Sequence, residues 1–345
     1  MSSDILVGIS TYNDYEYLEM LLQSIRWYTY NEDHKFDLVV CDDGTRMRNV
    51  TEDPNNPDML VLDDASVAMA DKTKDVAARF GATYIEHSRN LGIPSTWNSL
   101  ANSLGAQSRH IVILNNDIIV PPQWLDVVIH FLEANYDNPQ VGSTYWNPVN
   151  GVSKDLMRTI LPLIGHTAFT TEDLVSGKQR DFHGHSHTEV KIGDGQGLGR
   201  VMCMCGPGFG FTRKVWDEIG PFDARLTSFH EEIDWGTRCA SKGRASYGFA
   251  YPRPYHTHGA TFSYSPELEA GNRMVASRAL YREIWEVPGT VTDYMGWCHE
   301  KFMSQIPPTK LKYLRPDYSQ EPDERTLPGG EHVKLPRLVE FEEEF

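Results

Sequence analysis

Apolar and polar residues alternate in a regular rhythm over the first 150 residues of the chain. Short apolar runs predict buried strands, and the amphipathic stretches between them predict helices. The predicted strands are 5–10, 36–41, 82–87 and 110–114. The predicted helices are 15–28, 66–80, 94–104 and 123–136. This alternation predicts an α/β fold, with a mostly parallel sheet and helices on both of its faces.

Two segments interrupt the rhythm. Residues 46–64 are polar with two prolines, which predicts an insertion loop, and residues 151–200 are irregular. The pattern then resumes, with strands predicted at 201–205 and 245–255 and helices at 231–242 and 267–286. The last forty or so residues are rich in proline and acid, which predicts an extended tail that wraps on the body or frays.

The net charge limits the classes of binding partner, and the cysteine content indicates the cellular compartment. The chain has 32 Lys and Arg against 48 Asp and Glu, a formal net charge of −16. Such a chain repels nucleic acid and anionic membranes unless it carries a local basic patch, for which Lys178, Arg180 and Lys191 are the candidates. Five scattered cysteines indicate a reducing compartment. With no apolar run long enough to span a membrane and no leader-like start, we expect a cytoplasmic protein.

Polar side chains gather where the predicted strands end. In open α/β sheets, ligands bind beyond the carboxyl ends of the strands. The sequence therefore predicts a ligand site at this edge of the sheet. The residues at these strand ends are Thr11, Asn13, Asp42, Asp43, Asn90, Asn115, Asn116 and Asp117.

Two of these strand ends carry acids with a definable chemistry. Asp117, flanked by amides, suits Mg²⁺ or Mn²⁺ when phosphate oxygens of a ligand complete the shell; the alternative is an Asn/Asp turn. A carboxylate at Asp42 can accept the N–H of uracil, thymine or guanine; the alternative is a plain Asp-Gly turn. At 90–98, Gly92 permits close approach of a ligand and the following helix start favours an anion, unless the segment only caps that helix.

The segment His230 to Arg238 holds three acids beside apolar residues. Glu231, Glu232 and Asp234 suit a general base in a partly dry site, or simply complement the dipole at a helix start. Arg238 follows Asp234 by four residues and can pair with it. Further on, His256 and His258 alternate along a strand, and one of them could ligate a metal. A rival zinc site at His183, His185 and His187 lacks a cysteine partner at zinc-finger spacing.

The order of these motifs resembles the inverting glycosyltransferases of family 2, which have the GT-A fold. The motifs are ISTYN, VVCDDGT, NLGIPSTWN, ILNND, GPGFGFTRKVWDEIGPFD, HEEIDWGTR and HTHG, and they span roughly residues 4–262. The resemblance implies a glycosyltransferase domain at 1–262, with a nucleotide-sugar half at 1–150 and an acceptor half at 151–262. A helical extension at 263–305 and the acidic tail at 306–345 follow.

The resemblance also implies the activity: metal-dependent transfer of a sugar from a nucleoside diphosphate sugar, UDP-type, to an acceptor hydroxyl on a saccharide, with inversion. Glu232 occupies the place of the catalytic acid, and Mn²⁺ or Mg²⁺ is held by Asp117 and His258, since Gly259 follows His258. Asn115 stands where the family usually has the first acid of its metal element. Glu231 and Asp234 complete the catalytic cluster. The expected donor-binding residues are Thr11, Tyr12, Asn13, Asp42, Asp43, Asn90, Gly92, Asn98, Asn115 and Asn116.

The acceptor side is less defined by the sequence. Five aromatic residues could stack on a sugar face or belong to the core; they are Phe209, Phe211, Trp216, Phe229 and Trp235. Two other functions stay open: a phage-type enzyme that glycosylates a hydroxylated DNA base, which the net charge disfavours, and a non-catalytic relative that binds sugar or nucleotide. A dinucleotide-dependent oxidoreductase is disfavoured because no G-x-G-x-x-G follows the first strand. The oligomeric state stays open.

Overall fold

A mixed sheet of eight strands forms the centre of the described chain. The structure is a computed structural model, and it describes residues 4–29, 35–53, 56–103, 108–144, 147–148, 154–161, 198–201, 204, 206–227, 229–249, 251–257, 267–326 and 332–345. The strand order in the sheet is β10-β12-β8-β11-β6-β1-β2-β5. These strands are β1 (Ile5–Thr11), β2 (Phe36–Asp42), β5 (Thr83–Glu86), β6 (His110–Asn115), β8 (Val141–Thr144), β10 (Leu198–Val201), β11 (Gly208–Thr212) and β12 (Ser246–Phe249).

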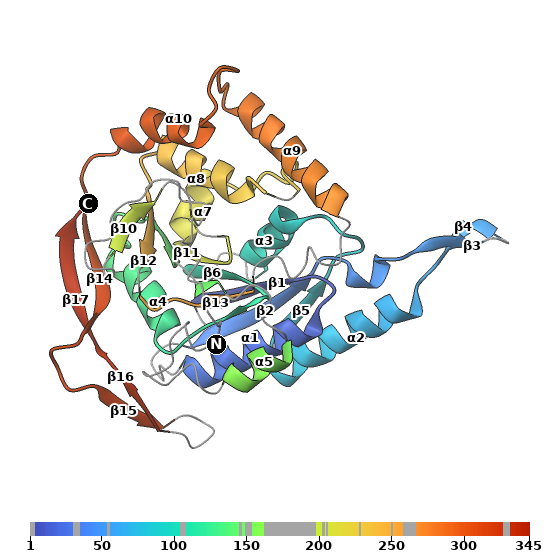
Figure 1. The fold of residues 1–345 in the computed structure, drawn as a ribbon, viewed down its shortest axis with the longest axis horizontal. Helices are drawn as coiled ribbons and strands as arrows, with labels where there is room; N and C mark the ends of the chain where they lie inside the picture. Colours follow the sequence, from blue (N-terminus) through green and yellow to red (C-terminus); the bar gives the residue numbers. More distant parts are fainter. Residues whose placement is uncertain are drawn as a thin grey trace.

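Helices cover both faces of this sheet (Figure 1). One face carries α1 (Tyr15–Tyr28), α2 (Asp64–Arg79) and α4 (Trp124–Ala134), and the other carries α3 (Ile93–Asn102), α7 (Arg213–Ile219) and α8 (Glu231–Ser241). Along β1, Ile5, Val7 and Ile9 pack toward α1 and α4, whereas Leu6 packs toward α3, as the two-residue period of a strand requires. The α/β fold predicted from the sequence is confirmed.

The parallel core of the sheet lies around β1. It pairs in parallel with β2 on one side and with β6 on the other. β2 in turn pairs in parallel with β5. On the far side of β6, β11 runs antiparallel to both β6 and β8. The carboxyl ends of β1, β2 and β6 therefore lie at one edge of the sheet.

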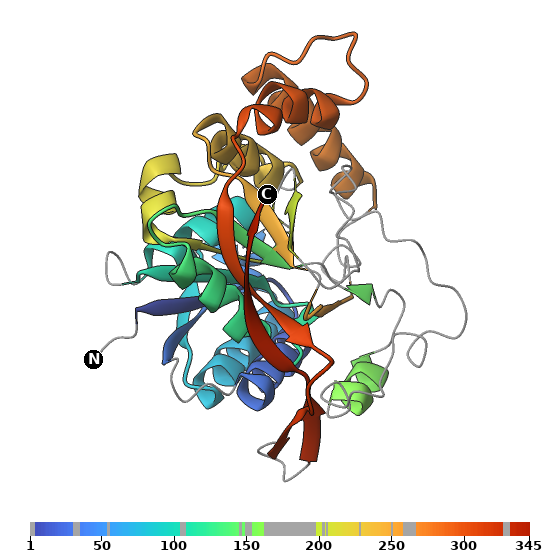
Figure 2. The ribbon, with the colours of Figure 1, turned by 90° about the vertical axis from the view of Figure 1, so that its left-hand side faces the viewer.

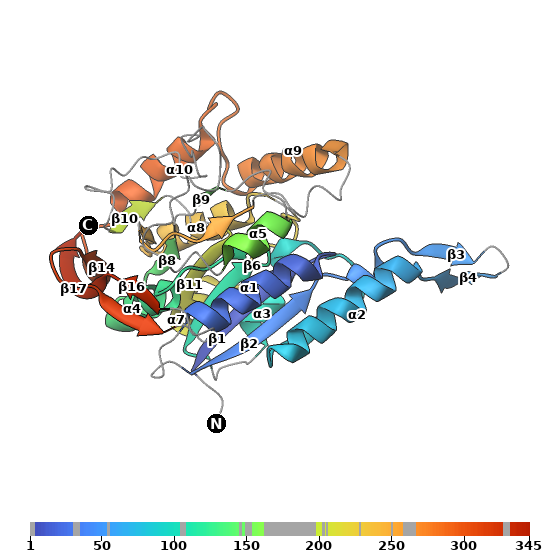
Figure 3. The ribbon, with the colours of Figure 1, turned by 60° about the horizontal axis from the view of Figure 1, so that its bottom comes forward.

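Three predicted segments differ from the structure. Residues 46–64 contain a short turn, η1 (Thr45–Met47), and a hairpin of β3 (Thr51–Asp53) and β4 (Asn56–Val61), which projects from the body (Figure 3). Of the strand predicted at 201–205, Val201 is the last residue of β10, Met204 lies in no strand, and the other positions lie outside the described residues. The strand predicted at 245–255 is interrupted because Pro252 and Pro254 have no N–H to donate.

That interruption creates a second, smaller sheet. After β12, the chain forms β13 (Tyr255–His256), which pairs with β7 (Ile118–Ile119) and β9 (Asn147–Pro148). Nearby, α5 (Lys154–Ile160) lies within the region predicted to be irregular. Lys154 fastens it to α1 through an ion pair from Nζ to Asp14 Oδ2, 2.6 Å long.

The C-terminal region is ordered and wraps over the body. After α9 (Glu267–Ile284), α10 (Tyr294–Lys301) and η5 (Met303–Gln305), β14 (Lys310–Asp317) pairs antiparallel with β17 (Arg337–Glu344), and β15 (Asp323–Thr326) pairs with β16 (His332–Leu335). Figure 2 shows the β14–β17 ribbon running across one side of the molecule. Leu311 and Tyr313 are buried in the core beside α4. The Arg200 guanidinium donates to the carbonyls of Ile306, Pro307 and Phe345.

Within the described residues, no helix is long and apolar enough to cross a membrane.

The close packing of β11 against α4 gives a stability prediction. A Cβ at Gly210 would lie 2.9 Å from Val128 Cγ1 and 3.1 Å from Leu132 Cδ1. Gly210→Ala should therefore lower the free energy of unfolding by about 1–3 kcal/mol, because a packed core has no room for the methyl group. Gly289→Ala, where nothing lies within 4 Å, is the control and should change it by less than about 0.5 kcal/mol. Urea denaturation of the two variants measures both, and equal stabilities would contradict this packing.

Candidate active site

Side-chain hydrogen bonds tie the ends of β1 and β6 together. Ser10 Oγ donates to Asn115 Oδ1 at 2.9 Å, and Asn116 Nδ2 donates to Thr11 Oγ1 at 3.0 Å. Thr11 and Asn116 are buried. The first predicted strand-end residues therefore form one connected layer at the edge of the sheet.

The turn after β2 is built around Asp42. Its Oδ1 accepts the backbone N–H of Thr45 at 2.9 Å, and its Oδ2 accepts the Tyr84 hydroxyl at 2.9 Å. Burial raises the pKa of Asp42, against the opposing hydrogen bonds from Thr45. Asn13, in the left-handed region at φ 55°, donates its N–H to Thr45 Oγ1. The Asp42 carboxylate is fully buried and shapes this turn, while contact of Asp42 with a base stays a prediction.

Asp43 holds the loop that follows β5. Its Oδ1 accepts the Leu91 N–H at 2.9 Å and lies 2.9 Å from His87 Nδ1. Its Oδ2 accepts the Gly92 N–H at 2.8 Å. Gly92 has φ +88°, and a Cβ there would lie 2.5 Å from the Thr227 carbonyl oxygen, so only glycine fits. The loop that contains Gly92 therefore lies in close contact with Thr227, in the segment that leads into α8.

Tyr12 and Asn90 face each other across this edge. Burial raises the pKa of Tyr12, and the charge of Arg48 and a hydrogen bond with the Asn90 side chain oppose that rise. The Arg273 guanidinium on α9 also acts on the Tyr12 hydroxyl. The sequence analysis did not identify these two arginines as site residues. Arg48 lies in a polar loop and Arg273 in an amphipathic helix, and neither belongs to a recognisable motif. The fold brings their charge to the predicted donor site.

The Asn98 side chain is hydrogen-bonded to the backbone of Phe222. Its Oδ1 accepts the Phe222 N–H at 2.8 Å, and its Nδ2 donates to the Phe222 carbonyl at 2.9 Å. This side chain therefore braces the connection between α7 and α8, and a contact with donor is a further role that the sequence predicts for it.

Asp117 and His256 lie side by side. Asp117 Oδ1 is 3.2 Å from His256 Nε2, and both side chains are buried. The pairing of β13 with β7 produces this contact, and the Thr257 N–H and hydroxyl each donate to the Asp117 carbonyl at 3.1 Å. The sequence favoured His258 for the metal, but His258 lies outside the described residues, as do His183, His185 and His187.

The Asp117–His256 pair fits part of a metal shell. Adjacent ligands of an octahedral ion, with bonds of about 2.0–2.1 Å, are separated by about 3 Å. The 3.2 Å between Asp117 Oδ1 and His256 Nε2 matches that spacing. Within the described ranges, no group of three or more His, Cys, Asp or Glu residues could hold a metal ion. Oxygens of a bound phosphate or water would therefore have to complete the shell.

Glu231 and Glu232 begin α8 after a strained turn. Phe229 and His230 have φ of 68° and 70°, a region that residues other than glycine seldom adopt. Both glutamates are buried. Burial raises the pKa of Glu231 well above the ordinary range, and the neighbouring charge of Glu232 raises it further. Such an environment suits a carboxylate that takes up a proton.

Asp234, in contrast, is engaged by two neighbours. Its Oδ2 accepts Arg238 Nε–H at 2.9 Å, which confirms the predicted pair, and its Oδ1 accepts the Trp285 indole N–H at 3.0 Å. Burial raises the pKa of Asp234, with Arg238 opposing. Asp234 thus fastens α9 to α8.

For the five aromatic residues, the sequence left sugar stacking and the core as alternatives, and four of them belong to the core. They pack beneath α3 in one buried cluster because their strand and helix faces point inward. Phe229 alone of the five is half-buried at the turn before Glu231. The four core residues are Phe209, Phe211, Trp216 and Trp235.

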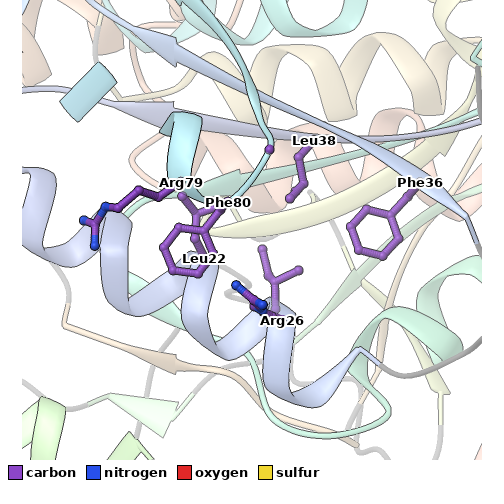
Figure 4. A pocket seen from close by; sticks show the side chains of 8 residues that line it. Leu22, Arg26, Phe36, Leu38, Arg79 and Phe80 are labelled. Carbon is purple, nitrogen blue, oxygen red and sulfur yellow. The ribbon is translucent and has the colours of Figure 1, made fainter. Parts of the chain in front are cut away.

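A separate pocket lies between α1, β2 and the end of α2 (Figure 4). Its volume is about 430 Å³, and apolar side chains line it together with the guanidiniums of Arg26 and Arg79. Phe36 and Leu38 belong to the amino-terminal half of β2, whereas Asp42 ends that strand. The pocket is therefore remote from the strand ends and does not belong to the candidate active site.

A comparison with protein-family models gives the class of the protein, a glycosyltransferase. A model of the family described as glycosyltransferase like family 2 matches residues 6–270, well over half of the chain. The chain therefore belongs to glycosyltransferase-like family 2. The mixed sheet with helices on both faces agrees with the GT-A fold that the sequence predicted.

Two solved structures similar to this chain are a mannosyltransferase and TarS. The mannosyltransferase PcManGT from Pyrobaculum calidifontis, in complex with GDP-Man and Mn²⁺, is 14% identical with a TM-score of 0.46, covering 87% of this chain and 69% of its own. TarS from S. aureus is 12% identical with a TM-score of 0.45, covering 89% of this chain and 81% of its own. A search of curated proteins found no match.

The raised pKa of Glu231 predicts how stability depends on pH. Above the ordinary glutamate pKa of 4.5, the unfolded chain releases this proton while the folded chain keeps it, so the free energy of unfolding falls as pH rises toward the folded pKa. Glu231→Gln, which mimics the protonated acid, should match wild type near about pH 4 and exceed it near about pH 8. Urea denaturation at both pH values measures this, with exposed Glu300→Gln as the control. A variant no more stable than wild type at the higher pH would contradict it.

Proposed function

We propose that this chain transfers a sugar from a nucleoside diphosphate sugar, UDP-type, to an acceptor hydroxyl, with inversion at the anomeric carbon. The observation that carries the proposal is the contact of Gly92 with the Thr227 carbonyl. It joins the loop held by Asp43 to the segment that leads into Glu231 and Glu232. A donor at the strand ends would therefore lie beside a buried acid pair.

The donor is bound by the residues at the carboxyl ends of β1, β2 and β6. Thr11, Tyr12 and Asn13 form one wall, and the Asp43-anchored loop with Asn90 and Gly92 forms another. A carboxylate at Asp42 favours a base that offers an N–H, which supports uridine over cytidine. Arg48 and Arg273 supply positive charge near Tyr12, where an anionic diphosphate would be stabilised.

Mn²⁺ or Mg²⁺ is held by Asp117 with His256, and His258 is the further ligand that the sequence predicts. When bound, such an ion neutralises the charge that gathers on a leaving diphosphate. The 3.2 Å separation of the two side chains supports this assignment. Asn115, in place of a first acid, is held by Ser10 and orients the strand end beside Asp117.

Glu232 is the general base. It takes the proton from the acceptor hydroxyl, and the acceptor oxygen attacks the anomeric carbon from the face opposite the diphosphate, which leaves with its bonding electron pair. Glu231 supports this role because its raised pKa keeps it protonated. One neutral acid beside Glu232 avoids the cost of burying two adjacent negative charges.

The division of the chain follows from these roles. Residues 1–150 bind the nucleotide sugar and residues 151–262 border the acceptor, for which a saccharide is the first choice; 263–305 is a helical extension and 306–345 a ribbon-forming tail. The cysteines that the structure describes, Cys41, Cys239 and Cys298, are free and buried, which supports a reducing, cytoplasmic setting.

Replacing Glu232 tests the base directly. Glu232→Gln should lower turnover by about 10²- to 10⁴-fold, because the hydroxyl keeps its proton, while nucleotide binding survives. Turnover of UDP-sugar, with calorimetric binding of UDP as the second measurement, separates the two effects. Glu283→Gln, an exposed residue of α9, is the matched control. Full turnover in Glu232→Gln would remove it from this role.

Replacing Asp117 tests the metal. UDP with Mn²⁺ should raise the melting temperature of the wild type more than TDP, GDP or CMP does, since a ligand at 100 times its Kd stabilises the folded state by about 2.7 kcal/mol. Asp117→Asn should lose the Mn²⁺-dependent part of that shift, whereas Asp155→Asn, whose side chain is 95% exposed, should keep it. Turnover that EDTA leaves unchanged would refute the metal assignment.

A further inference from the structure

Two helices outside the family match pack against the helix that carries the acid pair. Most of α9 and all of α10 lie beyond residue 270, where the match ends. They lie beside α8 in the views of Figure 1 and Figure 2. Ile233 of α8 is buried in one cluster with Tyr281 of α9 and Cys298 of α10. The extension therefore shares a core with the candidate base helix.

The first attachment is made by Tyr294 at the start of α10. Its hydroxyl lies 2.6 Å from His230 Nε2, and its ring stacks on the imidazole with centroids 5.6 Å apart at 29°. The Asp293 side chain caps α10 through the Gly296 N–H at 2.9 Å, which fixes the helix start. The guanidiniums of Arg278 and Arg282 lie 5.9 and 6.0 Å from the Tyr294 ring centroid. Tyr294 is thus held in one orientation against His230.

The second attachment lies on the other side of the acid pair. The Trp285 indole N–H donates to Asp234 Oδ1 at 3.0 Å, and Asp234 lies two residues after Glu232. The Asp234 N–H in turn donates to the His230 carbonyl at 2.8 Å, closing the first turn of α8. Contacts from the extension therefore flank Glu231 and Glu232 on both sides along the chain.

The backbone at this point needs such support. Phe229 and His230 are consecutive residues with positive φ, and neither is a glycine. Backbone of this kind persists only where surrounding contacts over-determine it. His230 has its side chain fixed by Tyr294 and its carbonyl engaged by Asp234, so the extension supplies part of what holds the strained turn.

We propose that Tyr294 is a positioning residue for Glu232: through His230 it fixes the turn that aims the base, so the C-terminal extension forms part of the active site. This inference rests on the proposed role of Glu232. Tyr294 touches neither donor nor acceptor in this account and acts only through the backbone at 229–231.

The test compares two tyrosines in the same interface. Tyr294→Phe keeps the ring and removes the hydroxyl bonded to His230. Tyr281→Phe is the matched control, because its hydroxyl bonds Thr237 at 2.9 Å and Cys298 at 2.8 Å, further along α8 from the acid pair. Hydrolysis of UDP-, TDP- and GDP-hexoses with Mn²⁺, with water as the acceptor, gives kcat and KM for each variant. Thermal melting is recorded in parallel.

We expect Tyr294→Phe to lower kcat by up to about 100-fold, since a small misplacement of the reacting group suffices, and to leave the donor KM within about twofold. Tyr281→Phe should lower the melting temperature and leave kcat near the wild-type value. A wild-type kcat in folded Tyr294→Phe, or an equal loss of kcat in both variants, would overturn the inference.

A second variant covers the case in which Tyr294→Phe does not fold. His230→Asn removes the same bond from the other side, and asparagine tolerates the positive φ at this position. It should show the same loss of kcat, and the double variant should lose no more than either single one, because both remove one interaction. Additive losses would refute the coupling. If the wild type hydrolyses none of the sugars, or Glu232→Gln hydrolyses them equally well, the proposed function itself fails, which is a different result.

Discussion

The parallel pairing of β1 with both β2 and β6 is the constraint on which the rest of the site depends. Three strands that run the same way must end at the same edge, so Thr11, Asp42 and Asn116 meet although they are far apart in the chain. Every other element of the site is attached to this edge. The loop at 87–92 is hydrogen-bonded to Asp43, and β7, which directly follows Asp117, pairs with β13, which contains His256.

The acids of the site divide by their surroundings. Asp43 and Asp234 accept hydrogen bonds from N–H groups. Through these bonds Asp43 holds a loop in place and Asp234 holds a helix end in place, so both carboxylates have a structural role. Burial raises the pKa of Glu231 well above its ordinary value, the charge of Glu232 adds to this, and a backbone hydrogen bond opposes it. Carboxyl groups of one cluster therefore differ by their surroundings and not by residue type: two of them accept N–H groups, and a third is buried where its charged form is disfavoured.

The C-terminal elements from α9 onward cover surfaces of the central α/β core. The β14–β17 ribbon buries Leu311 and Tyr313 beside α4, and α9 and α10 close over α8. The positive-φ turn at Phe229 and His230 is among the groups that these elements contact, because the His230 side chain bonds Tyr294 of α10. Fold and site are therefore supported from outside the segment that carries the motifs.

The sequence by itself determined the elements whose signals are local. The periods of two and 3.6 residues placed β1, α1 and α8 almost to the residue, and the i, i+4 spacing foretold the Asp234–Arg238 pair. Only the tertiary structure decided that His256 lies against Asp117, that Asp43 binds main chain at 91–92, and that Trp216 and Trp235 are core. Those outcomes depend on which strands pair and which helix faces meet, and contacts between residues distant in the chain leave no trace in a short window of sequence.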